Sequence, residues 1–343
     1  MTERTLTMRA LNRALLARQL LLEPSSLSIE DAIGHVGGLQ TQYAPSGYVG
    51  LWTRLSSFGR DDLTTALEDR TVIQASLMRT TIHMVSAREF WRYAVGIRRA
   101  RRAWALRLAG RATDETAMIA AAERIRETLA GGPRTVTELG EIGAGFVGNL
   151  GLWVDLVRVP PSGTWERRRA DRLGLAEDWV GPCDASEEEG LAHLVRAYLR
   201  AYGPAAWRDI ASWAGIPIGD ARRGGEALSL VRYRDELGRE LVDLPDAPLP
   251  DPDTPAPVRF LPHWDATLLV HARRAGILPE EYRPRVFSSR NPFSVGTYLV
   301  DGRVVGAWSL REGRVVLDPY EELPARDQQE VERERDALEA FHA

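Results

Sequence analysis

The sequence predicts a mainly α-helical fold with some β structure, made of tandem winged-helix (helix-turn-helix) modules and a β-barrel-like unit near the C-terminal end. Two observations support this prediction. Stretches with apolar residues at helical spacing are repeatedly followed by segments typical of hairpins. A proline-rich linker, DLPDAPLPDPDTPAPV, then separates these modules from a last group of predicted strands. With 343 residues and 44% apolar content, the chain can bury several cores.

The first predicted module covers residues 1–110. Leucines at helical spacing predict a helix at residues 10–22. The capping-type start at Ser28 predicts a second helix that runs to Gln40. The runs GYVGLWTRL and LTTALEDR are typical of two further short helices, and the alternating, β-branched run SLMRTTIHMV is typical of a strand.

Two further modules are predicted at residues 111–185 and 186–250. In the former, a helical segment precedes VRVPPSGTWERRR, whose Pro-Ser-Gly turn suits a wing-like hairpin. In the latter, the helices AAWRDIASWAG and GDARRGGEAL flank a Gly-Ile-Pro turn, and LVRYRDELGRELVDL is typical of a hairpin that turns at Leu237 and Gly238.

The C-terminal part divides into two predicted pieces. Residues 256–320 form the β-rich, barrel-like unit, where FLPHWDATLLV, GTYLVDGRVVGAWSL and GRVVLDP predict strands or a strand and a helix, with a hairpin turn at Asp301 and Gly302. Residues 321–343 form a charged amphipathic helix that begins near Asp327.

Composition excludes several kinds of chemistry. The chain has one cysteine, Cys183, so it can form neither an internal disulfide nor a cysteine-based zinc site, and no metal or other cofactor is expected. It contains no lysine, which excludes a Walker A nucleotide site, a pyridoxal-phosphate Schiff base and a lysine-dependent lyase step. No apolar run is long enough for a membrane span and no signal peptide is recognisable, so we expect a cytoplasmic protein.

The charge is unevenly distributed. The net charge of −4 argues against a strongly cationic nucleic-acid binder, but distribution matters more than the total. One segment carries a cluster of arginines: Arg98, Arg99, Arg101, Arg102, Arg107 and Arg111. Acidic residues gather at 187–189 and in the C-terminal tail. Taken alone, each cluster favours a solvated helix face.

Five segments together resemble the AlkZ-type winged-helix DNA glycosylases: GLQTQYAP, GYVGLWTRL, LMRTTIHMVS, RFLPHWDATLLVHARR and YLVDGRVVGAWSL. The resemblance extends from Leu11 to about Leu317. It implies tandem winged helices with a C-terminal barrel-like unit and an enzyme that removes N-alkylated purines from DNA. The family signature is a Gln-x-Gln or Gln-x-Asp pair, which here corresponds to Gln40 and Gln42. Thr41 departs from the apolar residue that many members carry between the two.

The resemblance implies a monofunctional hydrolase without lyase activity, acting on double-stranded DNA that carries alkylated purines. Some two-glutamine members protect antibiotic producers against their own DNA-alkylating products, including crosslinking agents. Self-resistance of that kind, with bulky adducts or interstrand crosslinks as substrates, and general repair of simple alkylation both remain open for this chain.

The chemistry of paired glutamines fits such substrates. A glutamine can orient a water molecule but cannot usefully accept its proton near neutral pH. An N7-alkylguanine or N3-alkyladenine is cationic and departs as a neutral base through an oxocarbenium-like transition state, so placement of water can suffice. A regular helix would splay Gln40 and Gln42 by roughly 200°, and we therefore expect the helix to end at or just before the pair.

Other candidate residues have two readings each. Candidates for contact with DNA or the lesion are Arg79, Thr80, His83, Asp265, Arg273, Arg274, Arg290 and Asn291. His83 is more typical of a structural histidine in a strand, Arg79 and Thr80 have the same two interpretations, and Asp265 is more typical of the N-cap of the following helix. The other arginines and the asparagine are otherwise ordinary solvated loop residues. Histidines around Asp265 match no metal-ligand spacing.

Two alternatives to an enzyme remain at this stage. A non-catalytic winged-helix transcription regulator or DNA-binding scaffold would keep the modules and basic patches but would not need the paired glutamines. An interaction protein would lack a continuous basic cleft around Gln40. A nuclease is disfavoured, since no carboxylates cluster at metal-site spacing. We expect a monomer because the sequence has no heptad seam.

Overall fold

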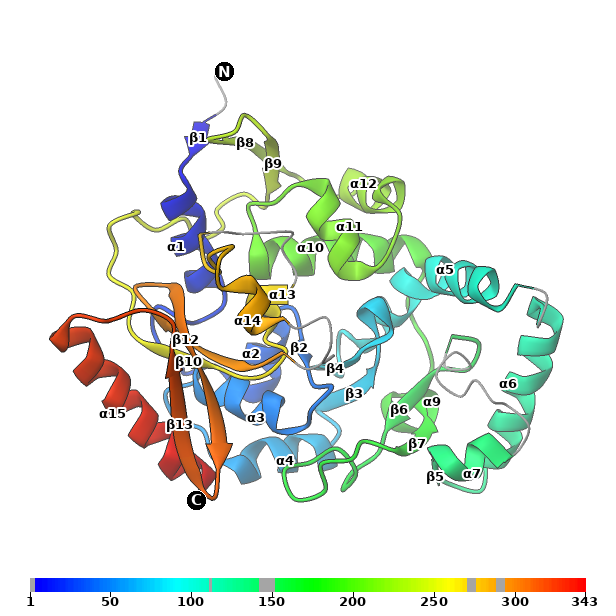
Figure 1. Ribbon diagram of the computed structural model, residues 1–343. Helices are drawn as coiled ribbons and strands as arrows, with labels where there is room; N and C mark the ends of the chain where they lie inside the picture. Colours follow the sequence, from blue (N-terminus) through cyan, green and yellow to red (C-terminus); the bar gives the residue numbers. More distant parts are fainter. Residues whose placement is uncertain (1–3, 111–112, 142–151, 270–275, 288–293) are drawn as a thin grey trace.

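The structure is a computed structural model that describes residues 4–110, 113–141, 152–269, 276–287 and 294–343 (Figure 1). It is a mixed α/β molecule. The described strands form three sheets, with the orders β2-β4-β3-β6-β7-β5, β1-β8-β9 and β10-β11-β12-β13. None of the described helices is both long and apolar enough to cross a membrane.

The N-terminal region contains the short helices that periodicity predicts. Its elements are β1 (Arg4–Leu6), α1 (Met8–Arg18), α2 (Ile29–His35), β2 (Leu39–Gln40), α3 (Pro45–Trp52), α4 (Arg60–Glu68), β3 (Val72–Ser76), the 3-10 turn η1 (Met78–Thr80) and β4 (Ile82–Ser86). The hydroxyl of Ser28 accepts a hydrogen bond from the backbone N–H of Asp31, which confirms the predicted cap of α2.

The predicted continuation of α2 to Gln40 is wrong. Gly37 and Gly38 have φ values of 76° and 83°, a left-handed conformation that only glycine adopts readily. Their N–H groups donate to the carbonyls of Gly34 and Ile33, which closes the helix in a Schellman arrangement. The chain then becomes extended, so the glutamine pair lies outside the helix, as its chemistry requires.

The single strand predicted for SLMRTTIHMV is also wrong. This segment is the turn of the β3–β4 hairpin, which reverses through η1. The sequence conceals the turn because Arg79 and Thr80, with φ values of 54° and 59°, stand where glycine or asparagine is usual.

The next region extends the same sheet. Its elements are α5 (Phe90–Ala109), α6 (Glu115–Leu129), β5 (Arg134–Thr135), α7 (Val136–Glu141), β6 (Leu156–Arg158), β7 (Arg172–Leu175) and α9 (Ala176–Val180). The predicted hairpin is present as the β6–β7 pair. β6 also pairs with β3, so one sheet runs through the first two predicted modules.

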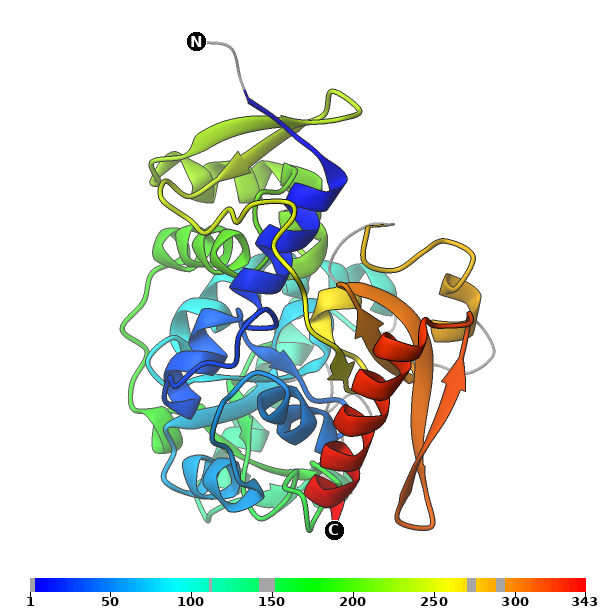
Figure 2. The same ribbon diagram turned by 90° about the vertical axis from the view of Figure 1, so that its left-hand side faces the viewer.

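The third region holds two consecutive short helices and the predicted hairpin. Its elements are α10 (Glu187–Tyr202), α11 (Trp207–Ala214), α12 (Ile218–Glu226), β8 (Val231–Asp235) and β9 (Glu240–Asp243). The hairpin turns at Leu237 and Gly238, and β1 joins the free edge of β8 in parallel. Strand β1 and helix α1 thus tie the start of the chain to this region (Figure 2).

The main core lies where α5 crosses α10. A Cβ atom on Gly96 would lie 2.7 Å from the backbone of Gly190, so the two helices can approach this closely only because both positions are glycine. Beside the crossing, Tyr198 and Tyr202 pack their rings against Trp213 of α11. This core supports η1, because the carbonyl of Trp213 accepts a hydrogen bond from Arg79.

The C-terminal unit is an open sheet. Its elements are β10 (Arg259–Leu261), α13 (Ala266–Leu269), α14 (Arg283–Val286), β11 (Gly296–Val300), β12 (Arg303–Arg311), β13 (Arg314–Pro319) and α15 (Ala325–His342). The predicted barrel is wrong: the described strands form a four-stranded antiparallel sheet with two edges and no closed barrel. The charged helix α15 covers this sheet instead, as Figure 2 shows in red.

Candidate active site

Gln40 ends strand β2 at the edge of the six-stranded sheet, and Gln42 follows in a bend. Gln40 pairs with His83 in the β2–β4 ladder, and the N–H of Thr41 continues that ladder by donating to the Ile82 carbonyl over 2.8 Å. The buried hydroxyl of Thr41 accepts a hydrogen bond from Gln74 of β3. The segment that carries both glutamines is thereby fixed against the β3–β4 hairpin.

Both amide oxygens are held by fixed donors. Oε1 of Gln40 accepts from Nη2 of Arg79 at 2.8 Å, and Oε1 of Gln42 accepts from the backbone N–H of Ile82 at 3.2 Å. A guanidinium and a backbone N–H can only donate, so these bonds fix which end of each amide is oxygen. Gln40 is buried, with 7% of its surface exposed, whereas Gln42 is exposed, so one amide is rigid and the other reaches solvent.

Arg79 and Thr80 hold the tight turn beside the pair. Nη1 of Arg79 donates to the carbonyl of Trp213 over 2.5 Å, and the hydroxyl of Thr80 donates to the Arg79 carbonyl over 2.6 Å. Two successive non-glycine residues at positive φ store strain, which is typical of functional sites. The turn thus aims Arg79 at Gln40.

A second guanidinium lies near Arg79. A Cβ on Gly215 would lie 3.2 Å from Nη1 of Arg101 and 3.3 Å from the backbone nitrogen of Arg79, which places both arginines around one glycine. Burial, followed by the charge of Arg79, lowers the pKa of Arg101 to about 10. Among the described residues, neither arginine forms an ion pair with a carboxylate. This side of the site is therefore positively charged and suits an anion such as phosphate.

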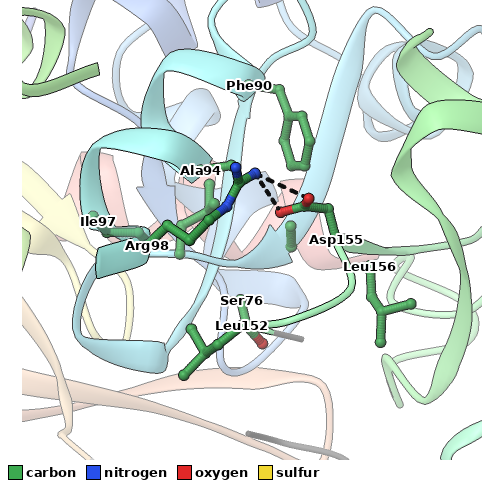
Figure 3. Close-up of a pocket in the computed structure, with 10 residues that line it drawn as sticks. Ser76, Phe90, Ala94, Ile97, Arg98, Leu152, Asp155 and Leu156 are labelled. Atoms are coloured by element: carbon green, nitrogen blue, oxygen red, sulfur yellow. Dashed lines mark hydrogen bonds and ion pairs between the residues drawn. The ribbon is translucent and has the colours of Figure 1, made fainter. Parts of the chain in front are cut away.

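The other arginines of α5 are mostly used within the protein. Arg98 binds both oxygens of Asp155, at 3.1 and 3.0 Å, in a small pocket below β3 (Figure 3). That cavity measures about 20 Å³, room for little more than one water molecule. Arg99 pairs with Glu187 and Asp220. Arg102 donates to the carbonyl of Leu152, and Arg107 is exposed, so Arg101 is the one buried arginine among the described members of the cluster. Arg111 lies outside the described residues.

His83 is a neutral, buried histidine. Its Nδ1 lies 2.9 Å from the carbonyl oxygen of Thr81, which can only accept, so Nδ1 carries the proton. Burial, and then the charge of Arg79, lowers the pKa of His83 to about 3. The ring therefore keeps an unprotonated Nε2 next to Gln40 throughout the physiological pH range.

Asp265 is bound within the protein. Its Oδ1 accepts from the N–H of Thr267 at 2.9 Å, which is an N-cap bond at the start of α13. The same carboxylate pairs with the buried guanidinium of Arg54 at 3.1 Å. It thereby joins the segment that follows β10 to the turn directly after α3. Arg273, Arg274, Arg290 and Asn291 lie outside the described residues, as does His271.

No pattern in the sequence indicates the pocket that includes the residue after Gln42. Tyr43, directly after Gln42, lines a cavity of about 260 Å³ together with Trp165, Arg168 and Trp308. These residues come from three distant parts of the chain, so only the fold brings them together. The part of the chain that the structure describes contains no group of histidine, cysteine or acidic residues able to hold a metal ion.

Comparisons with known proteins agree with this architecture. The family described as DNA glycosylase AlkZ-like matches residues 33–341. Among solved structures, Streptomyces sahachiroi DNA glycosylase AlkZ superposes with a TM-score of 0.81 at 20% identity, over 98% of this chain and 97% of that one. No curated protein sequence matches. Since the family match covers most of the sequence, this chain belongs to the AlkZ-like DNA glycosylase family.

Proposed function

We propose that the chain is a monofunctional DNA glycosylase that hydrolyses the N-glycosidic bond of cationic N-alkylated purines in double-stranded DNA. The observation that carries this proposal is the pair of amides at the end of β2, each with its oxygen oriented by a fixed donor of the β3–β4 hairpin. A carbonyl oxygen has a second lone pair, so each glutamine can still accept a hydrogen bond from a water molecule.

Gln40 and Gln42 would hold that water below C1′ of the lesion nucleotide. The bond between C1′ and the purine nitrogen breaks, its electron pair neutralises the cationic base, and the water oxygen bonds to C1′ and loses its proton to solvent. The chain has no lysine to form a Schiff base with the product, so the reaction ends at an abasic site.

Arg79 and Arg101 pose an electrostatic problem for this reaction, because cations next to a developing oxocarbenium raise its energy. A DNA phosphate bound between them would neutralise their charge and supply an anion close to the sugar. We therefore assign Arg79 and Arg101 to the phosphate flanking the lesion. The unprotonated Nε2 of His83 would accept a hydrogen bond from the water or the sugar.

The surrounding fold suits duplex DNA. We interpret α11, α12 and the β8–β9 hairpin as a winged-helix module, and the β3–β4 and β6–β7 hairpins as wings of two others. We infer a monomer that works in the cytoplasm on N7-alkylguanine and related lesions. The same proposal extends to bulky natural-product adducts and interstrand crosslinks, which the enzyme would remove in a self-resistance role.

The test is release of 7-methylguanine from methylated duplex DNA. In a Gln40→Ala, Gln42→Ala double variant we expect the single-turnover rate to fall on the order of 10³-fold, with DNA binding retained. The matched control is Gln328→Ala, Gln329→Ala, two exposed glutamines on α15, which should leave the rate unchanged. No release by the wild type, even from bulky N7 adducts, would refute the glycosylase; retained release in the double variant would refute the role of the pair.

A further inference from the structure

The cavity beside Tyr43 has walls from five separate parts of the chain. We call it the aromatic pocket and define it by Tyr43, Ser46, Trp165, His263, Trp308 and His342. Its volume of about 260 Å³ lies just below the range of roughly 300–1,000 Å³ typical of sites for drug-sized ligands. The pocket is thus large enough for one small ring system and too small for a bulky adduct.

The rings of the pocket form a continuous series. Tyr43 and His263 have centroids 5.6 Å apart, His263 and Trp308 5.9 Å, Trp308 and His342 5.9 Å, and His342 and Trp165 5.3 Å. All four contacts are edge-to-face. Aromatic walls of this kind favour flat ligands that stack on them, as nucleobases do.

Two polar groups lie among these rings. Nδ1 of His342 lies 2.9 Å from the carbonyl oxygen of Leu338 and must donate to it, so Nε2 of the neutral ring is a hydrogen-bond acceptor. The hydroxyl of Ser46 is buried and has no partner among the described residues. A buried polar group without a partner is unfavourable, and a ligand that carries both donors and acceptors would satisfy both groups.

The charge of the pocket selects a neutral ligand. Arg168 lies over the rings of Tyr43 and Trp165, at 6.0 and 5.6 Å, and donates to the Tyr43 hydroxyl over 3.1 Å. It already occupies the cation-binding faces of those rings, and no described carboxylate lines the cavity. A cationic alkylated purine is therefore disfavoured there, whereas the neutral base formed by bond cleavage is not.

We propose that the aromatic pocket binds the purine base released by the reaction, in its neutral form, before the base leaves the enzyme. This inference rests on the proposed glycosylase function, because it makes the pocket the product site of that reaction. One of its walls, Tyr43, directly follows Gln42 in the chain, which supports the assignment. A base held there is removed from the sugar and cannot recombine with it.

The experiment measures binding of free 7-methylguanine to the DNA-free protein by saturation-transfer NMR, together with its inhibition of base release. Leu310→Trp, at a half-exposed position lining the pocket, should fill it and weaken binding at least tenfold. His342→Phe keeps a ring but removes the acceptor, and should weaken binding roughly three- to tenfold. Leu237→Trp, at the exposed tip of the β8–β9 hairpin, is the matched control and should bind like the wild type.

Absence of both binding and product inhibition in the wild type would overturn the inference, and so would equal binding by all four proteins. If Leu310→Trp does not fold, His342→Phe decides alone. Failure of the proposed function is a separate result: it would be seen as a wild type that releases no base from alkylated DNA. If the wild type releases the base from alkylated DNA normally but does not bind the free base, only the assignment of the aromatic pocket as the product site is refuted.

Discussion

The turn that carries Arg79 binds Gln40, and the aromatic pocket includes Tyr43, the residue after Gln42, yet the two regions are built from opposite kinds of side chain. Around the turn, two arginines stand without a described carboxylate partner, next to oriented amides. In the pocket, rings and neutral histidines dominate. The difference indicates two tasks, one for phosphate and water and one for the base. Mutations on each side should therefore change different measured quantities.

The largest expected effect is on the buried ion pair between Asp265 and Arg54, which joins the segment after β10 to the turn after α3. Asp265→Ala leaves the guanidinium of Arg54, which is 1% exposed, buried without its counter-ion. We expect a loss of about 3–5 kcal/mol in the free energy of unfolding, measured by denaturant titration. Asp253→Ala is the control, because the Asp253 side chain is 96% exposed and its ion pair with Arg9 is long, at 3.9 Å. Equal stability of the two variants would contradict the structural role of Asp265.

The next effect concerns the salt dependence of DNA binding, which should differ between variants of the two regions. Arg79→Met and Arg101→Met should each weaken binding to unmodified duplex DNA roughly tenfold and reduce the slope of log affinity against log salt by about 1. Leu310→Trp should leave that slope unchanged, since the pocket binds a neutral group. Arg333→Met on α15 is the exposed control. An unchanged slope in both arginine variants would show that no phosphate lies between them.

A smaller effect concerns the support of the turn. Gly215 has a φ of 74°, and a Cβ there would lie 3.3 Å from the backbone nitrogen of Arg79. Gly215→Ala should therefore cost about 1–2 kcal/mol of stability and slow base release by displacing Arg79. Gly219→Ala, in a helix with open space around it, should be neutral or slightly stabilising. Thermal melts of both variants provide the comparison.

The smallest effect is on the pH profile. Burial lowers the pKa of every described histidine, including His83, His263 and His342, so none of them titrates above its usual value of 6.5. A cationic base also needs no proton to leave. The single-turnover rate should therefore be constant between about pH 7 and 9. An inflection within that interval would show that an ionising group takes part in the reaction.

The same shift has a consequence for stability with a defined sign. The pKa of His83 is lower in the folded than in the unfolded chain, so the unfolded chain binds more protons between about pH 6.5 and pH 3. The contribution of neutral, buried His83 to the free energy of unfolding is fully present above pH 6.5 and is lost as the pH falls towards 3. In His83→Gln this part of the acid dependence should be absent from denaturation curves.

Sequence reasoning identified local features well. Helical periodicity located α1, α3, α4, α11 and α12, and turn chemistry located the hairpins at Gly238 and Gly302. It failed where the backbone takes unusual angles. The glycines that end α2 were read as part of the helix, and the strained Arg79–Thr80 turn was read as strand because its residues favour β structure.

The sequence singles out the glutamine pair through the resemblance carried by four other segments, since an isolated Gln-x-Gln is typical of a surface polar pair. The catalytic role of the pair stays a prediction. The surroundings of the pair could not be predicted. The neighbouring sequence of each pocket residue is typical of ordinary core or surface positions. It does not indicate that Trp165, Trp308 and His342 lie together beside Tyr43. Likewise, the arginine cluster on α5 gave no hint that Arg101 alone turns inward.

The contacts of α1 have a consequence for the order in which the protein folds during synthesis. Asn12 donates to the carbonyl of Gly302, Arg13 pairs with Asp301, and Arg18 pairs with Asp243 at 2.7 Å. These partners emerge from the ribosome more than two hundred residues after α1. Until then, two arginines destined for full burial have no counter-ion, so α1 cannot dock stably on a nascent chain. Folding of this protein is therefore completed late, when its last third closes over its first helix.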